Sequence, residues 1–312
     1  MKSIKMIRSI IPIVTILLIL CYPLLQAQNS TTVRANGESE VVVITATDYA
    51  FEAPDEIESG WRNIRFSNEG EDPHLILFSR LPEGKTVDDY LTEAGPPFNK
   101  AWYQLRDGKI TPQEITGILG KTVPEWFWGV ERMGGAGLVM RGGVAETTIN
   151  LPPGNYAMEC YIKTEDGEIH FMEGMARPIR VLDKNSGGTA PKADLLIKVS
   201  NTELEVHGDL TAGKRVVEVQ ITEKPDKGLG HDVHVARLGA GANLQEVVQW
   251  MNWYSPNGMR EPTPDHATFI GGMHFLPLNS PGYFTIDLSP GRYLFVSGAA
   301  ADKGIFQEIR VK

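Results

Sequence analysis

A stretch in the middle of the chain recurs near its C-terminus, and this repetition constrains the fold more than any other feature. Gly134–Tyr156 aligns without a gap with Gly271–Tyr293, and both segments end in a Pro-Gly-X-Tyr turn. Upstream, His74–Leu81 aligns with His231–Leu238. Because a unit that recurs in sequence is one structural unit built twice, we expect two copies of a single domain.

Both copies consist mainly of short β-branched or aromatic runs separated by turn residues. In the first copy these runs lie at 41–45, 63–66, 75–78, 146–151, 156–162 and 178–182. The pattern predicts an all-β fold of two tandem Greek-key β-sandwiches with short helical insertions. The helices are expected from Thr86 to Ala94, after the capping box of Thr111, and from Leu244 to Trp253 behind a cap at Asn243.

A composition break separates the two copies. Residues 183–192 lack apolar periodicity and are rich in Gly, Ser, Lys and Pro, which is typical of a linker. We therefore place domain 1 at 40–182, the linker at 183–193 and domain 2 at 194–312.

The N-terminus indicates export. Lys2, Lys5 and Arg8 precede an apolar run at 10–25, which is the pattern of a secretory signal peptide. We expect residues 1–27 to be removed, which leaves 285 of the 312 residues, enough for two small domains. The alternative is an uncleaved N-terminal anchor, and only then is a membrane a partner. Either way the protein is predicted to be periplasmic or secreted.

Charge and cysteine content narrow the function. The formal net charge is −9, and such an acidic chain repels phosphate backbones, so nucleic acid is not expected as a partner. Of the two cysteines, Cys21 lies within the predicted signal and leaves Cys160 alone. An intrachain disulfide is then impossible in the mature chain, and the lone thiol requires another explanation.

Cys160 opens a group of soft and imidazole side chains. His170 follows it after nine residues, and Met175 follows His170 after four, all in one strand-loop-strand segment. A trigonal copper site requires two imidazoles and one thiolate, with a weak axial methionine sulfur. His74, which follows a turn at 68–73, is our candidate for the second imidazole.

These residues resemble the cupredoxin (blue copper) family, and the long loop is most similar to that of copper nitrite reductases, with one more residue between cysteine and histidine. The resemblance implies one type 1 copper ion, used for one-electron transfer with a redox protein partner or for holding copper. The segments that carry the resemblance are 64–70, Pro73-His74, 153–156 and the implied ligands His74, Cys160, His170 and Met175.

The second copy lacks this ligand set. Ser297 stands at the position of Cys160, and the following loop is shorter. His231 nevertheless persists at the position of His74. A histidine can thus be kept there for structural reasons, and the alternative interpretation is a metal-free β-sandwich interaction module in which Cys160 is an inert buried residue.

Two further alternatives concern catalysis and a different metal site. A multicopper reductase or oxidase needs a second copper centre whose histidines flank the type 1 ligands, whereas Glu159 and Tyr161 flank Cys160, so we expect no enzyme of this kind. A second metal site from His231, His234, His266 and His274 is the other alternative. His231 and His234, three residues apart on a strand, point to opposite faces.

Overall fold

The computed structural model describes residues 40–226 and 228–312. The predicted signal peptide, 1–27, lies outside the described residues, and that prediction stays a prediction. Strands make up 41% of the structure and helices 19%. The all-β class predicted from the sequence is therefore confirmed. Of the helices in the part of the chain that the structure describes, none combines the length and apolarity needed to cross a membrane.

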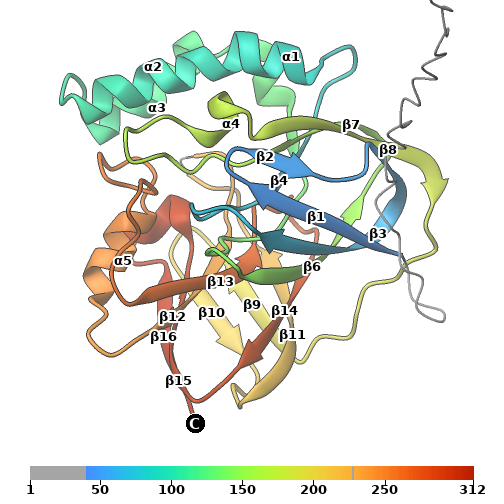
Figure 1. Ribbon diagram of the computed structural model, residues 1–312, viewed down its shortest axis with the longest axis vertical. Helices are drawn as coiled ribbons and strands as arrows, with labels where there is room; N and C mark the ends of the chain where they lie inside the picture. Colours follow the sequence, from blue (N-terminus) through green and yellow to red (C-terminus); the bar gives the residue numbers. More distant parts are fainter. Residues whose placement is uncertain (1–39, 227) are drawn as a thin grey trace, which may run out of the picture.

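We call residues 40–185 the N-terminal half and residues 195–312 the C-terminal half (Figure 1). In the N-terminal half, the long strand β3 joins two sheets: its first residues pair with β8, and the remainder pairs with β1 and β6. The strands of this half are β1 (Val41–Thr47), β2 (Ala50–Glu52), β3 (Glu56–Asn68), β4 (Leu77–Arg80), β5 (Glu131–Arg132), β6 (Val144–Leu151), β7 (Gly154–Glu159) and β8 (Ala176–Asn185).

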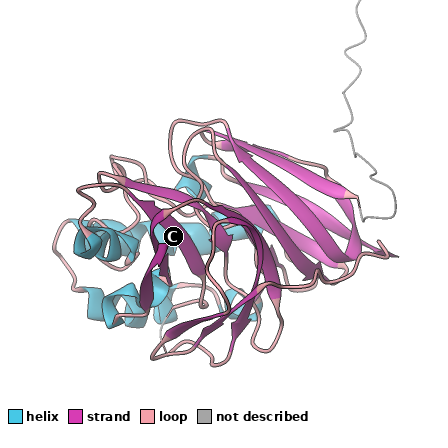
Figure 2. Cartoon of the chain, turned by 90° about the horizontal axis from the view of Figure 1, so that it is seen from below, coloured by secondary structure: helices cyan, strands magenta, loops and turns pink. Residues whose placement is uncertain are grey.

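The C-terminal half also has two sheets. One has the order β10-β9-β11-β14 and the other the order β13-β12-β15-β16. Figure 2 shows the strands as curved layers, with helices gathered on one side. The strands are β9 (Leu195–Val199), β10 (Leu204–His207), β11 (Gly213–Ile221), β12 (Val233–Leu238), β13 (Ala267–Met273), β14 (Gly282–Leu288), β15 (Gly291–Val296) and β16 (Phe306–Val311).

The two halves share a continuous sheet, because β14 pairs antiparallel with β6. Thr147 and Phe284, which the sequence alignment matches to each other, are direct partners in this pairing. Ala136 and Met273, another aligned pair, form an isolated bridge. The halves therefore meet through segments that the sequence alignment matches to each other.

A helical insertion covers one end of the N-terminal half (Figure 1). Thr86 caps its first helix as predicted, since Thr86 Oγ1 accepts the Asp89 N–H at 3.2 Å. The helical segment does not stop at Ala94, because the two prolines that follow lie in the first turn of α2, where a missing N–H costs nothing. The elements are α1 (Val87–Asp89), η1 (Tyr90–Ala94), α2 (Gly95–Arg106), α3 (Pro112–Thr122) and η2 (Glu125–Gly129).

Three shorter helical elements complete the structure. In the helix of the C-terminal half, the Asn243 side chain accepts the Gln245 N–H at 3.1 Å, as the predicted cap requires. These elements are α4 (His170–Glu173), α5 (Leu244–Met251) and η3 (Gly298–Lys303).

Alternation of side chains along the strands builds the core. In β1, Val42, Ile44 and Ala46 are buried while the residues between them are more exposed, as expected for a strand with one face on the core. The insertion has a core of its own, around Trp102 and Phe127. Between the halves, β8 runs to Asn185 and β9 begins at Leu195.

Candidate metal centre

His74 lies in an extended segment just before β4, where its main chain is fixed on both sides. Its N–H donates to the Val139 carbonyl at 3.1 Å, and the Val139 N–H donates back at 2.8 Å. The preceding turn is held by Asn68, whose side-chain amide donates to the carbonyls of Val139 and Asp72 at 2.9 and 2.8 Å. The His74 side chain is therefore fully buried in a fixed place.

Cys160 follows the last residue of β7 and is also fully buried. Its N–H donates to the Met175 carbonyl at 3.0 Å. Burial raises the pKa of the thiol to about 12, and hydrogen bonds from the backbone N–H groups of Leu75 and Ile162 to the sulfur act in the opposite direction. The two N–H groups are donors suited to a thiolate.

His170 returns to the cysteine through a tight reversal of the chain. The Thr164 N–H donates to the Glu168 carbonyl and the Gly167 N–H donates to the Thr164 carbonyl, both at 2.9 Å. The His170 N–H then donates to the Ile162 carbonyl at 2.8 Å. The reversal thus places the imidazole beside Cys160 rather than in solvent.

The three predicted ligand atoms converge. His170 Nδ1 lies 3.6 Å from Cys160 Sγ, and His74 Nδ1 lies 3.9 Å from it. All three atoms lie within 4.8 Å of one another, and no other group of three or more His, Cys, Asp and Glu side chains in residues 40–226 and 228–312 is arranged this way. Met175 is fully buried next to the cluster, and its N–H donates to the His170 carbonyl at 2.9 Å.

The outer nitrogens of both imidazoles face carboxylates. His74 Nε2 lies 2.7 Å from Asp48 Oδ1, and His170 Nε2 lies 3.6 Å from Asp72 Oδ2. The Asp72 carboxylate also accepts the Tyr49 hydroxyl at 2.7 Å. A carboxylate at Nε2 favours the tautomer that keeps the proton there and leaves Nδ1 with a free lone pair toward the sulfur.

Burial also keeps both imidazoles neutral. It lowers the pKa of His170 to about 3 and lowers the pKa of His74 as well, although Asp48 partly offsets the shift at His74. Neutral imidazole is the form that binds a metal, so no proton must leave these side chains at neutral pH.

The donor set fits copper. Two neutral imidazole nitrogens and one thiol sulfur surround a common point, and a thioether residue lies beside them, which is the ligand combination of trigonal copper sites. The His170 Nε2 atom is buried and has no hydrogen-bond partner among the described residues. The imidazole therefore lies beside Cys160 with the hydrogen-bonding capacity of its outer nitrogen unused. Metal coordination at Nδ1 would polarise Nε2–H and strengthen its attraction to Asp72.

Asp48 and Asp72 were not among the residues predicted from the sequence. Asp48 follows β1, and the parallel pairing of β1 with β3 brings it to the turn that precedes His74. No local pattern links residues that are 26 positions apart. Asp72 stands in the predicted turn, and its proximity to His74 along the chain was the available signal.

In the C-terminal half, the residue at the position of Cys160 bonds a neighbouring carboxylate instead of facing imidazole nitrogens. Ser297 Oγ donates to Asp232 Oδ1 at 3.1 Å, and His234 Nε2 lies 3.0 Å from Asp232 Oδ2. His231 Nε2 lies 3.2 Å from Asn201 Oδ1. The four histidines of the alternative metal site do not form a group of converging ligands among the described residues.

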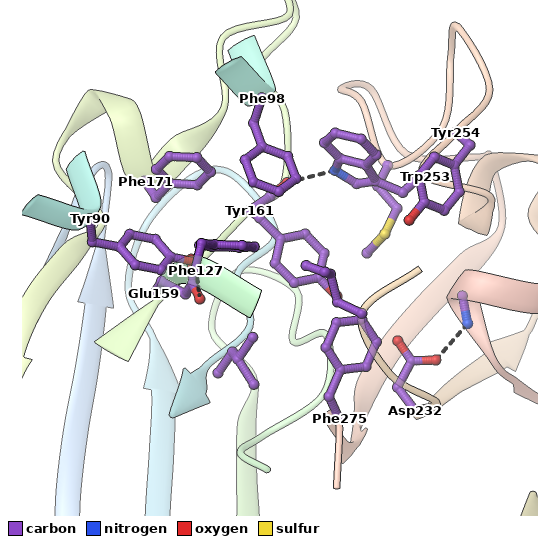
Figure 3. A pocket seen from close by; sticks show the side chains of 14 residues that line it. Tyr90, Phe98, Phe127, Glu159, Tyr161, Phe171, Asp232, Trp253, Tyr254 and Phe275 are labelled. Atoms are coloured by element: carbon purple, nitrogen blue, oxygen red, sulfur yellow. Dashed lines mark hydrogen bonds between the residues drawn. The ribbon is translucent and has the colours of Figure 1, made fainter. Parts of the chain in front are cut away.

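The two residues that flank Cys160 point into an apolar cavity of about 60 Å³ between the halves (Figure 3). The Glu159 carboxylate accepts the Ser79 hydroxyl at 2.8 Å and the Tyr90 hydroxyl at 2.8–2.9 Å, and burial raises its pKa. Tyr161 stacks on Phe275. The cavity is lined by Leu77, Tyr90, Phe98, Phe127, Glu159, Tyr161, Phe171, Leu229, Asp232, Trp253, Tyr254, Met259, Phe275 and Gly298.

No protein-family model matches the chain, and no curated protein matches its sequence. Solved structures similar to it include auracyanin from Roseiflexus castenholzii, which is 16% identical, with 47% of this chain and 99% of that chain covered and a TM-score of 0.25. Rusticyanin from Thiobacillus ferrooxidans is 23% identical, with 38% and 76% covered and a TM-score of 0.24.

The Cu-containing nitrite reductase from Thermus scotoductus is 12% identical, with 87% of this chain and 61% of that chain covered and a TM-score of 0.23. At these identities and TM-scores, the similarities carry no information about function. Each half has the paired sheets that the sequence predicted, and Cys160 follows β7 directly, with His74 beside it.

Proposed function

We propose that the protein binds one copper ion through His74, Cys160 and His170, with Met175 as a weak axial ligand, and uses it for one-electron transfer with a redox protein partner. The observation that carries this proposal is the convergence of three donor atoms within 4.8 Å of one another. Both outer imidazole nitrogens face carboxylates, so the inner nitrogens are free for a metal.

Copper held by such ligands exchanges one electron between its Cu(I) and Cu(II) states. The chain supplies a buried, water-excluding site whose ligands are fixed by main-chain hydrogen bonds from three separate segments. Cys160 must lose its proton for a metal to bind, and the N–H groups of Leu75 and Ile162 stabilise the resulting thiolate. A rigid site of this kind rearranges little when the charge changes.

The test is a titration of the mature protein with Cu(II), monitored by visible absorption. We expect an intense thiolate-to-copper band at one equivalent of copper. Cys160→Ser should abolish it, and the matched variant Ser297→Cys should neither remove it nor add a second band. A wild-type protein that gives no band would contradict the proposal and favour the metal-free interaction module.

We also propose export, on the basis of the signal-like sequence at 1–27. Edman sequencing of the protein recovered from the producing cells should begin at Gln28. A recovered protein that begins at Met1 and sediments with membranes would instead indicate the N-terminal anchor.

A further inference from the structure

The ligand-bearing loop of the N-terminal half is bonded to the C-terminal half at Lys163. The Lys163 N–H donates to the Met259 carbonyl at 2.9 Å, and the Glu261 N–H donates to the Lys163 carbonyl at 3.0 Å. Lys163 and Arg260 thereby form a parallel bridge. The loop from Cys160 to Met175 is therefore paired, along its main chain, with a segment about 100 residues away in the sequence.

The side chain of Lys163 extends this attachment into the interior. Its Nζ donates to the Trp253 carbonyl at 2.9 Å and to the Gly258 carbonyl at 2.5 Å. The same atom lies 3.9 Å from the ring centroid of Trp102 and 4.1 Å from that of Trp253. Lys163 therefore joins three parts of the molecule: the ligand loop, helix α2 of the insertion and the C-terminal half.

A lysine at this place is costly, because its ammonium is fully buried. Burial, with a smaller contribution from Arg260, lowers its pKa well below the usual value, while two carbonyl acceptors and two indole faces favour the charged form. An aliphatic side chain would fill the same space at a lower desolvation cost but could not direct hydrogen bonds to two chosen carbonyls. The hydrogen bonds of Lys163 therefore fix the position of the loop and do not serve to bury apolar surface.

Other side chains hold the loop in the same manner, each by donating to one of its carbonyls. Trp253 Nε1 donates to Tyr161 at 3.2 Å, and Arg260 Nε donates to Glu165 at 2.9 Å. From the insertion, Trp102 Nε1 donates to Gly167 at 2.6 Å. The donors come from outside the loop, so the loop's conformation depends on its neighbours.

We propose that Lys163 is a positioning residue for the metal centre and that the C-terminal half, which lacks the ligand set, serves as the support onto which Lys163 locks the ligand loop. Its neighbour Ile162 transmits the effect, since the Ile162 carbonyl accepts the His170 N–H and the Ile162 N–H bonds the Cys160 sulfur. The role in copper binding rests on the function proposed above. The attachment of the ligand loop to the C-terminal half through Lys163, which we call the lock, is a property of the metal-free protein.

The first test uses the metal-free protein. A thiol reagent such as 5,5′-dithiobis(2-nitrobenzoate) reaches the buried Cys160 only when the loop opens locally. Lys163→Met should raise the labelling rate about tenfold or more, which corresponds to about 1.4 kcal/mol less resistance to opening. The matched control is Lys214→Met, which removes an exposed lysine that also reaches between the halves, to Glu146 at 3.3 Å, and should leave the rate within about twofold.

Trp253→Phe is the second variant, in case Lys163→Met does not fold by circular dichroism. It keeps an aromatic ring but removes the N–H donor to Tyr161. We expect labelling several-fold faster than in the wild type. Labelling within twofold of the wild type in Lys163→Met, or in Trp253→Phe where Lys163→Met does not fold, would contradict the proposed attachment of the loop.

The copper-loaded protein provides the second readout. In Lys163→Met the thiolate-to-copper band should lose intensity and shift, with a changed copper hyperfine splitting in the electron paramagnetic resonance spectrum, while Lys214→Met keeps the wild-type spectrum. An unchanged spectrum in Lys163→Met would overturn the positioning role. If the wild type gives no band, the copper function fails, and the labelling rates still decide whether the lock exists.

Discussion

The two halves place different chemistry at matching positions of similar sheets. In the N-terminal half, Leu75 follows the histidine and supplies only a backbone N–H to the cysteine sulfur. In the C-terminal half, Asp232 follows the matching histidine, and its carboxylate accepts the Ser297 hydroxyl and the Gly298 N–H at 3.1 and 2.7 Å. In the C-terminal half, the hydroxyl at the position of the cysteine is thus bonded to a neighbouring carboxylate, whereas in the N-terminal half the thiol and two imidazole nitrogens face a shared point. The comparison teaches that a few side chains, and not the sheets, distinguish the candidate metal centre from its counterpart in the other half.

The largest expected effect tests the N-terminal side of this comparison. His170→Ala removes one of the three converging donors, and we expect copper affinity to fall at least a hundredfold, with loss of the visible band. Equilibrium titration against a competing chelator measures the change. His231→Ala, at the position that matches His74, is the control in the other half, and a comparable loss of copper affinity there would show that the wrong half had been assigned.

The next effect concerns the C-terminal side. Asp232→Ala leaves His234 and Ser297 without their shared buried acceptor, and we expect a loss of about 3 kcal/mol in the free energy of unfolding. Urea denaturation measures it, with the exposed Asp226→Ala as the control. A loss below 1 kcal/mol would mean that the hydrogen bonds to Asp232 contribute little to the stability of the protein.

A smaller effect is expected at the outer nitrogens. Asp48→Asn weakens the acceptor for His74 Nε2, and copper affinity should fall about tenfold, since groups of this kind typically contribute one to two orders of magnitude. Asn201→Ala removes the corresponding partner of His231 and should leave copper affinity unchanged. An equal change in copper affinity in the two variants would contradict the assignment of the metal centre to the N-terminal half.

The last expected effect is a pH dependence shared by the halves. Burial lowers the pKa of His170 and of His274 to about 3, below the unfolded value near 6.5. Between these pH values the two histidines are protonated in the unfolded chain but neutral in the native metal-free protein. The free energy of unfolding is therefore highest above about pH 6.5 and falls as the pH drops toward 3. Each histidine contributes about 1.4 kcal/mol per pH unit in that window. Urea denaturation from pH 7 to 5 measures the slope, and His170→Gln and His274→Gln should each reduce it; an unchanged slope in either variant would exclude that histidine.

Local sequence patterns predicted the longer strands of the N-terminal half, and the resemblance to the cupredoxin family supplied the candidate ligands. Runs of β-branched residues indicated β1 and β6, turn residues indicated their ends, and the structure brings the candidate ligands Cys160 and His170 within 3.6 Å of each other. The partners of the ligands could not be predicted in this way. Asp48 meets His74, and Lys163 meets Trp253, through pairings between distant segments that leave no periodic trace in the sequence.

The contact between the two halves could not be predicted from local sequence patterns either. The composition of residues 183–192 predicts a linker, but it contains no information about the pairing of β6 with β14, which depends on two strands 137 positions apart at Thr147 and Phe284. Edge pairing is set by the surfaces that remain after each sandwich has formed.

The shared sheet has a consequence for the behaviour of the two halves if they are separated. Each half alone would present β6 or β14 as an open edge with unused hydrogen-bond donors and acceptors, a template for uncontrolled association. Pairing of the two strands around Thr147 and Phe284 covers this part of both edges at once. A protease that cuts the chain between Ser186 and Asp194 should therefore leave two fragments that stay together, and their separation would require unfolding conditions rather than dilution.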